Sequence, residues 1–244
     1  MTKHIPNILT GFNMFFGCMA ALFAFMHQFE LTAICILCGA AFDLFDGAAA
    51  RALQVTSPLG NQLDAMADLI SFGFVPGLVM FQQLQISGLP RQQMYFQFLG
   101  MDLHVSFVYL GLFAFLIPLA SALRLAVFVT KEHNQPDFSG VPTPANALLF
   151  VGYPLLLGME QMKGLQSILG QAWFIIPLIV VMSILLNAPI RLFSLKKYPQ
   201  LKPTIFYQLV LVLGALALLY FFQLGAMTLI MLLYLFLNII RNLG

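Results

Sequence analysis

Long apolar runs constrain this chain more than any other feature of its sequence. Runs of about 20 mostly apolar residues recur from end to end, which is the length a helix needs to cross the hydrocarbon core of a bilayer. Only 8% of the 244 residues are charged, whereas soluble domains typically carry about 25%. We therefore expect an all-α integral membrane protein that forms a single membrane-embedded domain over residues 1–244.

Eight of these runs are candidate membrane-spanning helices. The last two are separated by a very short turn at 223–225, so they should form an antiparallel pair. The two longest loops are expected at 85–103 and 130–143. The eight candidate spans are 8–26, 31–51, 64–84, 104–129, 144–160, 171–190, 204–222 and 225–241.

The positions of Lys and Arg indicate how the chain is oriented. Of the 11 such residues, only Arg91 and Lys163 fall on one side of the eight-span arrangement. The other nine share the side of both termini, and Lys and Arg are enriched in cytoplasmic loops. Both termini should therefore be cytoplasmic, in the cell inner membrane. The nine are Lys3, Arg51, Arg124, Lys131, Arg191, Lys196, Lys197, Lys202 and Arg241. The net charge of +2 is too small to suggest a nucleic-acid partner.

Four of the nine acidic residues lie in one stretch between apolar runs, DLFDGAAARALQVTSPLGNQLDAMAD, residues 43–68. Asp43 and Asp46 are three residues apart and Asp64 and Asp68 four apart, so each pair shares one face of a helix. The residues between them include Thr56, Ser57, Pro58 and Gly60, a composition typical of turns. Two antiparallel helices joined there would bring all four carboxylates together, at or just below the cytoplasmic membrane surface.

These carboxylates predict a metal site. An Asp at the centre of a span costs about 2.5–3.5 kcal/mol, and two divalent cations would neutralise four of them. Oxygen ligands suit magnesium, manganese or calcium and not zinc. Small residues at 47–50 leave open space, and the Arg51 guanidinium suits phosphate, so the stretch favours phosphoryl transfer. Solvated helix-end charges and a cation channel or transporter are the alternatives.

The stretch resembles the CDP-alcohol phosphotransferase family at every position of its signature. The matching residues are Asp43-x2-Asp46-Gly47-x2-Ala50-Arg51-x8-Gly60-x3-Asp64-x3-Asp68. The resemblance implies a membrane enzyme with a six-helix core (about 5–200), two divalent cations, magnesium or manganese, and a cytidine-diphosphate lipid donor. The extra pair at about 204–241 would lie outside that core.

Further segments resemble the phosphatidylserine synthases of bacteria and archaea within this family. They are IPNILTGFNMFFGCMA, DLISFGFVPG, SALRLAVF, FSGVPTPAN and IRLFSLKKYPQLK. This resemblance implies CDP-diacylglycerol and L-serine as substrates, and phosphatidylserine and CMP as products. A sister enzyme with a glycerol phosphate or inositol phosphate acceptor is the alternative within the family, and a divalent-cation transporter is the alternative outside it.

The resemblance also implies roles for individual residues. Asp43, Asp46, Asp64 and Asp68 would bind the metals, and Asp68 would also take the proton of the attacking hydroxyl. The donor CDP-diacylglycerol would be bound by Asn7, Thr10, Gly47, Ala50, Arg51 and Gly60. For Arg124 two roles stay open, as a partner of the serine carboxylate or of a lipid phosphate, or as a snorkelling anchor. Gly73-x3-Gly77 favours close helix packing, at the contact of an expected homodimer or, with Pro76, within a bent helix.

Overall fold

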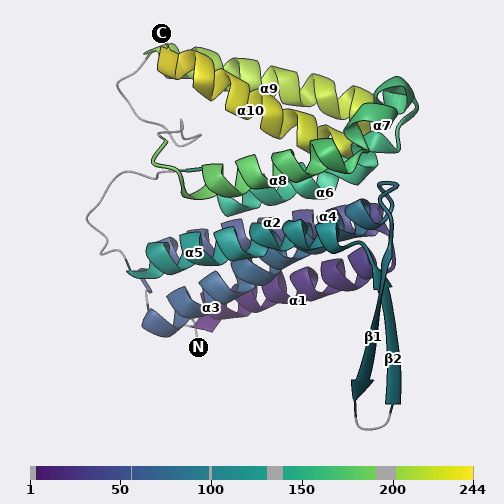
Figure 1. Cartoon of the computed structure of the whole chain (residues 1–244). Helices are drawn as coiled ribbons and strands as arrows, with labels where there is room; N and C mark the ends of the chain where they lie inside the picture. Colours follow the sequence, from purple (N-terminus) through teal and green to yellow (C-terminus); the bar gives the residue numbers. More distant parts are fainter. Residues whose placement is uncertain (1–3, 56, 99–100, 131–139, 191–201, 244) are drawn as a thin grey trace.

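Figure 1 shows the computed structural model, which describes residues 4–55, 57–98, 101–130, 140–190 and 202–243. Helices form nearly all of it, as predicted. The α-helices are α1 (Ile5–Phe25), α2 (Phe29–Ala52), α3 (Pro58–Asp68), α4 (Val75–Gln85), α5 (Leu116–Thr130), α6 (Thr143–Leu157), α7 (Lys163–Leu169), α8 (Ala172–Asn187), α9 (Lys202–Phe222) and α10 (Ala226–Leu243). Shorter elements are the π-helix η2 (Leu69–Phe74), the 3-10 helices η3 (Tyr109–Phe115), η4 (Glu160–Met162) and η5 (Gln223–Gly225), and strands β1 (Gln92–Phe98) and β2 (Met101–Phe107).

Five segments of the described chain are long and apolar enough to cross a membrane. Four are Ile5–Phe25, Phe29–Ala52, Pro58–Gln85 and Tyr109–Thr130. The fifth, Ile205–Arg241, covers most of α9 and α10, which lie side by side in Figure 1. The bent pair of α7 and α8 can be counted as a sixth, and α6 is apolar but shorter. The protein is thus helical and membrane-embedded, while the number of eight spans stays a prediction.

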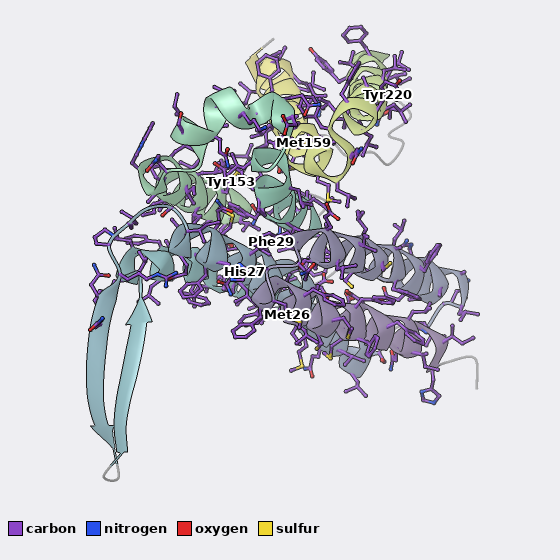
Figure 2. The ribbon with its side chains drawn as sticks, turned by 90° about the vertical axis from the view of Figure 1, so that its right-hand side faces the viewer. Met26, His27, Phe29, Tyr153, Met159 and Tyr220 are labelled. Atoms are coloured by element: carbon purple, nitrogen blue, oxygen red, sulfur yellow. The ribbon has the colours of Figure 1, made fainter. Side chains whose placement is uncertain are left out.

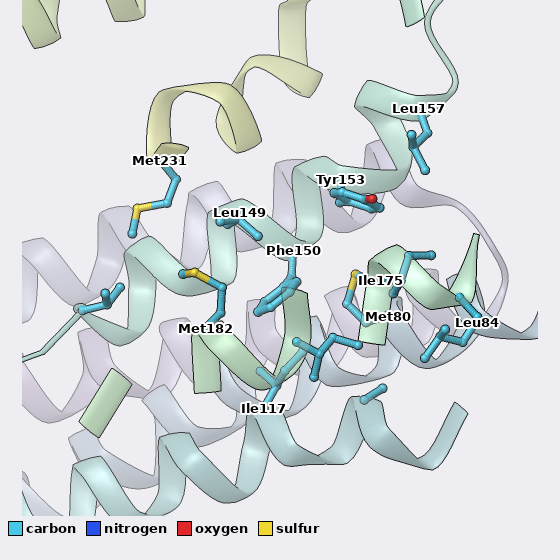
Figure 3. Close-up of a cluster of buried hydrophobic side chains, with 14 residues drawn as sticks. Met80, Leu84, Ile117, Leu149, Phe150, Tyr153, Leu157, Ile175, Met182 and Met231 are labelled. Carbon is cyan, nitrogen blue, oxygen red and sulfur yellow. The ribbon is translucent and has the colours of Figure 1, made fainter. Parts of the chain in front are cut away.

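The helices pack in layers. In Figure 1, α1 to α5 form one layer, α6 and α8 lie above it, and the pair α9 and α10 forms the opposite edge. One buried cluster joins α4, α5, α6 and α8, with Met80, Ile117, Phe150 and Ile175 at its centre (Figure 3). A second cluster joins α1, α2, η2 and α4 to α6 and α10. These two cores fix α6 against both neighbouring layers.

The turn between α1 and α2 makes these helices antiparallel. His27 has a φ of 59°, the left-handed conformation that reverses the chain, and its ring packs edge-on against Phe29 with centroids 5.9 Å apart. Figure 2 shows Met26, His27 and Phe29 together at this turn. Because α2 runs back along α1, the C-terminal half of α2, where Asp43 and Asp46 are found, lies beside the N-terminal half of α1.

The expected span 64–84 is helical throughout, but it changes form directly after Asp68. Residues 69–74 form a π-helix, and the N–H of Val75 bonds the carbonyl of Ile70, five residues back. Pro76 follows, and a proline lacks an N–H and clashes with the carbonyl four residues earlier in an α-helix. The wider π turn accommodates this proline within the span.

The two glycines of Gly73-x3-Gly77 pack against α5 of the same chain. A Cβ built on Gly73 would lie 3.1 Å from the Cβ of Ser121, and one built on Gly77 would lie 2.8 Å from Cδ of Pro118. Their spacing therefore serves close packing inside the molecule, and no dimer contact is needed to explain it.

The segment between α4 and η3 was predicted wrongly. Residues 85–103 were expected to be a loop and 104–129 a helix, yet β1 and β2 pair antiparallel from Gln92↔Phe107 to Phe98↔Met101. The hairpin extends away from the helices in Figures 1 and 2. Polar and apolar residue types alternate along 101–107, which is the period of a strand, while an averaged hydropathy window merges this stretch with the apolar run after it.

Two further corrections concern the chain after α6. The expected span 144–160 ends at Leu157, and η4 and α7 occupy residues where a loop was expected. The hydroxyl of Tyr153 (labelled in Figure 2) donates to the carbonyl of Leu169 at 2.7 Å and thereby ties α6 to α7. Five of the basic residues used to predict orientation lie outside the described residues: Lys3, Lys131, Arg191, Lys196 and Lys197.

Candidate metal and nucleotide site

The acidic stretch folds into two helices joined by a short turn, as its composition predicted. Asp43 and Asp46 lie near the end of α2, and Asp64 and Asp68 lie on α3. Ser57 caps α3, since its Oγ accepts from the N–H of Gly60 at 3.0 Å. Such a cap satisfies one of the free N–H groups at a helix start. The cap fixes where α3 begins and hence which of its faces turns toward α2.

Three of the four carboxylates come together. Asp43, Asp64 and Asp68 each offer one oxygen, and these oxygens lie within 4.8 Å of one another. Oδ1 of Asp64 is buried and has no hydrogen-bond partner among the described residues. A buried unpaired carboxylate oxygen is costly, and a cation shared with the other two carboxylates would satisfy it. This all-oxygen set fits magnesium or manganese.

Asp46 lies outside this group of three. It is 5% exposed, and its Oδ2 lies 2.7 Å from Oγ1 of Thr10 on α1. The same hydroxyl lies 3.0 Å from the carbonyl of Pro6. A hydroxyl has one hydrogen to donate, and a carboxylate is the stronger acceptor. The structure therefore shows Thr10 holding Asp46, while the expected contact of Thr10 with a nucleotide is not tested.

Asn13 is a site residue that the sequence reasoning did not single out. Its Nδ2 donates to Oδ1 of Asp68 at 3.2 Å, and its side chain is fully buried. The sequence contained an indication of this role, because Thr10, Asn13 and Gly17 recur at helical spacing. In the structure all three are buried on α1. Polar residues on the buried face of a membrane helix are a mark of function.

Arg51 and Gly47 lie one above the other along α2. Arg51 is exposed, and a Cβ built on Gly47 would lie 3.3 Å from its Nη1. A larger residue at 47 would press on the guanidinium. Ala50 is half-buried beside them. Arg51 lies five residues beyond Asp46 along α2, and its exposed guanidinium suits a phosphate group.

Gly60 and Asn7 are in close contact across α3 and α1. A Cβ built on Gly60 would lie 3.1 Å from Oδ1 of Asn7 and 3.0 Å from Oγ of Ser57. Only a residue without a side chain leaves this approach free. The signature glycine therefore lets the start of α3 lie against α1, and it brings Asn7 to the same end of the bundle as the acids.

Arg124 connects two other helices, α5 and α8. Its Nη1 donates at 2.6 Å to the carbonyl of Leu186, near the end of α8. A Cβ built on Gly140, whose φ is +85°, would lie 2.9 Å from the same nitrogen. Nearby, Nδ2 of Asn187 donates to the carbonyl of Ala120 at 3.0 Å. Arg124 thus joins α5 to the end of α8, which neither of its two expected roles had included.

Several curated proteins of the same name are similar to this chain. "CDP-diacylglycerol--serine O-phosphatidyltransferase" of Helicobacter pylori is 30% identical over 148 residues, which cover 60% of this chain and 55% of that protein. The protein of that name from Bacillus subtilis is 29% identical over 149 residues, covering 61% and 74%. The one from Methanocaldococcus jannaschii is 29% identical over 166 residues, covering 68% and 67%. The chain thus spans only about half of the Helicobacter relative's length.

The family itself is shown by a match to most of the chain. The profile of the CDP-alcohol phosphatidyltransferases matches residues 3–185, a range that holds α1 to α7, nearly all of α8 and all four acids of the site. It ends before α9 and α10, the helices for which no motif of the resemblance was found. By this match and by the geometry of its carboxylates, the chain belongs to the CDP-alcohol phosphatidyltransferase family.

Proposed function

We propose that this protein transfers the phosphatidyl group of CDP-diacylglycerol to the hydroxyl of L-serine, giving phosphatidylserine and CMP. The observation that carries the proposal is the meeting of Asp43, Asp64 and Asp68 at one end of a membrane-embedded bundle. The names of the similar proteins support the choice of donor and acceptor. The location is suitable too, because a site at the membrane surface receives water-soluble serine and a lipid with buried acyl chains.

Two divalent cations, magnesium or manganese, are proposed as cofactors. Asp43, Asp64 and Asp68 would hold them, and Asp46 would join once its other oxygen turns toward the site. Bound cations would neutralise charge on the diphosphate and on the departing CMP. Phosphoryl transfer depends mainly on positioning and electrostatics, which suits a site that offers carboxylates and a guanidinium.

The donor would lie between α1, α2 and the start of α3. The Arg51 guanidinium would bind the diphosphate with two parallel hydrogen bonds. Gly47, Ala50 and Gly60 would let the nucleotide approach the main chain closely, and Asn7, which lies against Gly60, would contact it. Thr10 would support the site by holding Asp46 in place. A direct contact of Thr10 with the nucleotide is also proposed.

Asp68 would act as the general base. The serine hydroxyl oxygen attacks the β-phosphorus, which carries the diacylglycerol, while its proton passes to a carboxylate oxygen of Asp68. A new phosphorus–oxygen bond forms, and the bond from that phosphorus to the bridging oxygen of the diphosphate breaks. CMP leaves with the electron pair of the broken bond, so charge and atoms balance.

An acceptor panel tests the proposal. Purified protein with CDP-diacylglycerol and magnesium or manganese is expected to release CMP with serine and far less with glycerol phosphate or inositol phosphate. Phosphorylated acceptors would require an additional basic pocket beside the metals. Chelation by EDTA should abolish the release, and either ion should restore it.

Each other outcome of this panel identifies an alternative. CMP release with glycerol phosphate or inositol phosphate in preference to serine would make the chain a sister enzyme of the family. No CMP release with any acceptor, together with divalent-cation flux through proteoliposomes, would favour a transporter.

The serine carboxylate is proposed to bind near Arg124. Its Nη1 is engaged by the carbonyl of Leu186, so this proposal rests on the resemblance of SALRLAVF to the phosphatidylserine synthases and on the fit of a guanidinium to a carboxylate. The competing role is the anchoring of α5 to α8 that the structure shows. A homodimer is also proposed, without an assigned interface.

The proposed orientation places both termini and the acidic site in the cytoplasm. In Figure 1, α3 and α7 lie at opposite ends of the bundle. The exposed residue Asn61 belongs to α3, and the exposed residue Gln166 belongs to α7. In a variant without the three native cysteines, we expect Gln166→Cys to react with an impermeant maleimide added outside intact spheroplasts, and Asn61→Cys to react only after lysis. Labelling of Asn61→Cys in intact spheroplasts would contradict this orientation.

A further inference from the structure

One face of α1 contacts both acid-bearing helices. The buried residues of this helix are Pro6, Thr10, Asn13, Gly17, Ala20 and Ala24. The two with the best side-chain donors, Thr10 and Asn13, are three residues apart and so lie on one face. Thr10 contacts a carboxylate from α2, and Asn13 contacts one from α3. The helix α1 therefore bridges the two halves of the acidic site.

The amide of Asn13 has one favourable orientation. Its Nδ2 lies 3.2 Å from Oδ1 of Asp68, and its own Oδ1 would lie 3.0 Å from a Cβ built on Gly39 of α2. That oxygen has no partner among the described residues. Rotating the amide by half a turn would set its oxygen against a carboxylate oxygen, and two acceptors repel. Burial between α2 and α3 also denies the side chain other rotamers.

The main chain of Asn13 is held as well. Oγ of Ser71 donates to the backbone carbonyl of Asn13 at 3.1 Å. Ser71 lies on η2, three residues after Asp68. The short segment 68–71 therefore carries the carboxylate and also holds the main chain of Asn13, the residue that contacts this carboxylate. Gly17 allows this approach, because a Cβ there would lie 3.1 Å from Cα of Ser71. The geometry between Asn13 and Asp68 is therefore fixed at two points.

From this geometry we propose that Asn13 is a positioning residue for Asp68. Its amide occupies Oδ1 of that carboxylate and leaves Oδ2 as the oxygen that faces the acceptor hydroxyl. The proposal rests on the function proposed above, in which Asp68 takes the proton of that hydroxyl. Asn13 itself contacts neither the substrates nor the reacting atoms. Its effect is to hold the base in one orientation, so that the lone pair that accepts the proton points in one direction.

A double-mutant cycle tests the proposal. Loss of a hydrogen-bond partner of a metal-site ligand typically costs about 10–100-fold in activity or metal affinity, so we expect Asn13→Ala to lower kcat by that factor with the KM values for serine and CDP-diacylglycerol nearly unchanged. In the Asp68→Asn background the same substitution should cause no further fall, since residues that act through one another are not additive. An equal fall in both backgrounds, or no fall in the wild-type background, would overturn the proposal.

Two controls separate positioning from folding. Asn13→Leu keeps the branched shape and the number of side-chain heavy atoms without the amide, and it should lower kcat as Asn13→Ala does, while its melting temperature stays near that of the wild type. Asn238→Ala removes another buried asparagine, which donates to the carbonyl of Tyr234 within α10 at 2.8 Å, and it should leave kcat close to the wild-type value. A fall in kcat that follows melting temperature across these variants would refute positioning.

Metal binding provides a readout that needs no turnover. When Mn²⁺ affinity is measured by EPR without substrates, Asn13→Ala should weaken it by no more than Asp68→Asn does. The double variant should bind Mn²⁺ no more weakly than Asp68→Asn alone. Additive losses would refute a role through Asp68. Because this arm does not depend on the acceptor, a protein that binds Mn²⁺ with non-additive losses but releases no CMP would reject the proposed function and retain the coupling of Asn13 to Asp68.

Discussion

Asp68→Asn is expected to lower kcat by about 10²–10⁴-fold, the usual contribution of a general base, while the protein still binds metal and CDP-diacylglycerol. An amide in place of the carboxylate keeps the volume and keeps an oxygen that can accept from Nδ2 of Asn13, so the local packing should survive. What is lost is the ability to take a proton. Steady-state kinetics with serine, together with Mn²⁺ binding by EPR, would measure both parts of this expectation.

Asp43→Asn serves as the matched comparison, because both residues belong to the same group of three carboxylates. We expect it to weaken metal binding, with activity partly recovered at high metal concentration. If Asp68→Asn shows the same recovery, Asp68 is chiefly a metal ligand and the base lies elsewhere. Near-full activity of Asp68→Asn would show that the proposed proton transfer is wrong.

The helices were predictable because lipid-facing segments must be both apolar and long. The expected spans 8–26 and 31–51 agree with α1 and α2 to within a few residues, and the turn at 223–225 became η5. The hairpin of β1 and β2 was missed for a physical reason. An averaged hydropathy value does not depend on whether apolar residues recur with the period of a strand or of a helix, so residues 104–107 were assigned to the helix that follows. Only the alternation of polar and apolar residues could have distinguished the strand from that helix.

The site was predictable where chemistry depends on spacing along one helix. Asp43 and Asp46 on α2, and Asp64 and Asp68 on α3, follow from intervals of three and four residues, and three of these acids do meet. Contacts between helices were not predictable in the same way. Nothing in the spacing of Arg124 indicates the carbonyl of Leu186, because that contact depends on how α5 and α8 pack.

Asn13 illustrates the same limit inside the site. Its position on the buried face of α1 could be read from the sequence, yet its partner is set by the antiparallel turn at His27 and by the π-helix that follows Asp68. Both depend on local backbone conformation, which residue types constrain only weakly. The close approach of Gly17 to Ser71 has the same origin, and it leads to the second large effect that we expect.

Gly17→Val is expected to destabilise the protein and to remove most of its activity. A Cβ at this position would collide with Oγ of Ser71 and lie 3.1 Å from its Cα, so α1 and η2 would have to separate. Overpacking of a closely packed site typically costs about 1–3 kcal/mol. Separation would also break the hydrogen bond from Ser71 to the carbonyl of Asn13, and Asn13 would shift away from Asp68.

Gly11→Val is the control on the same helix, since a Cβ built on Gly11 meets nothing within 4 Å. It should leave stability unchanged or raise it slightly, because valine is a better helix former than glycine.

Thermal unfolding in detergent and serine-dependent CMP release would be measured for both variants. Adding Ser71→Gly to Gly17→Val should restore part of the stability, since it removes the two side-chain atoms nearest the added Cβ. Equal melting temperatures for Gly17→Val and Gly11→Val would mean that the contact between α1 and η2 yields to a larger residue. In that case the fixed geometry at Asn13 could not be attributed to this contact.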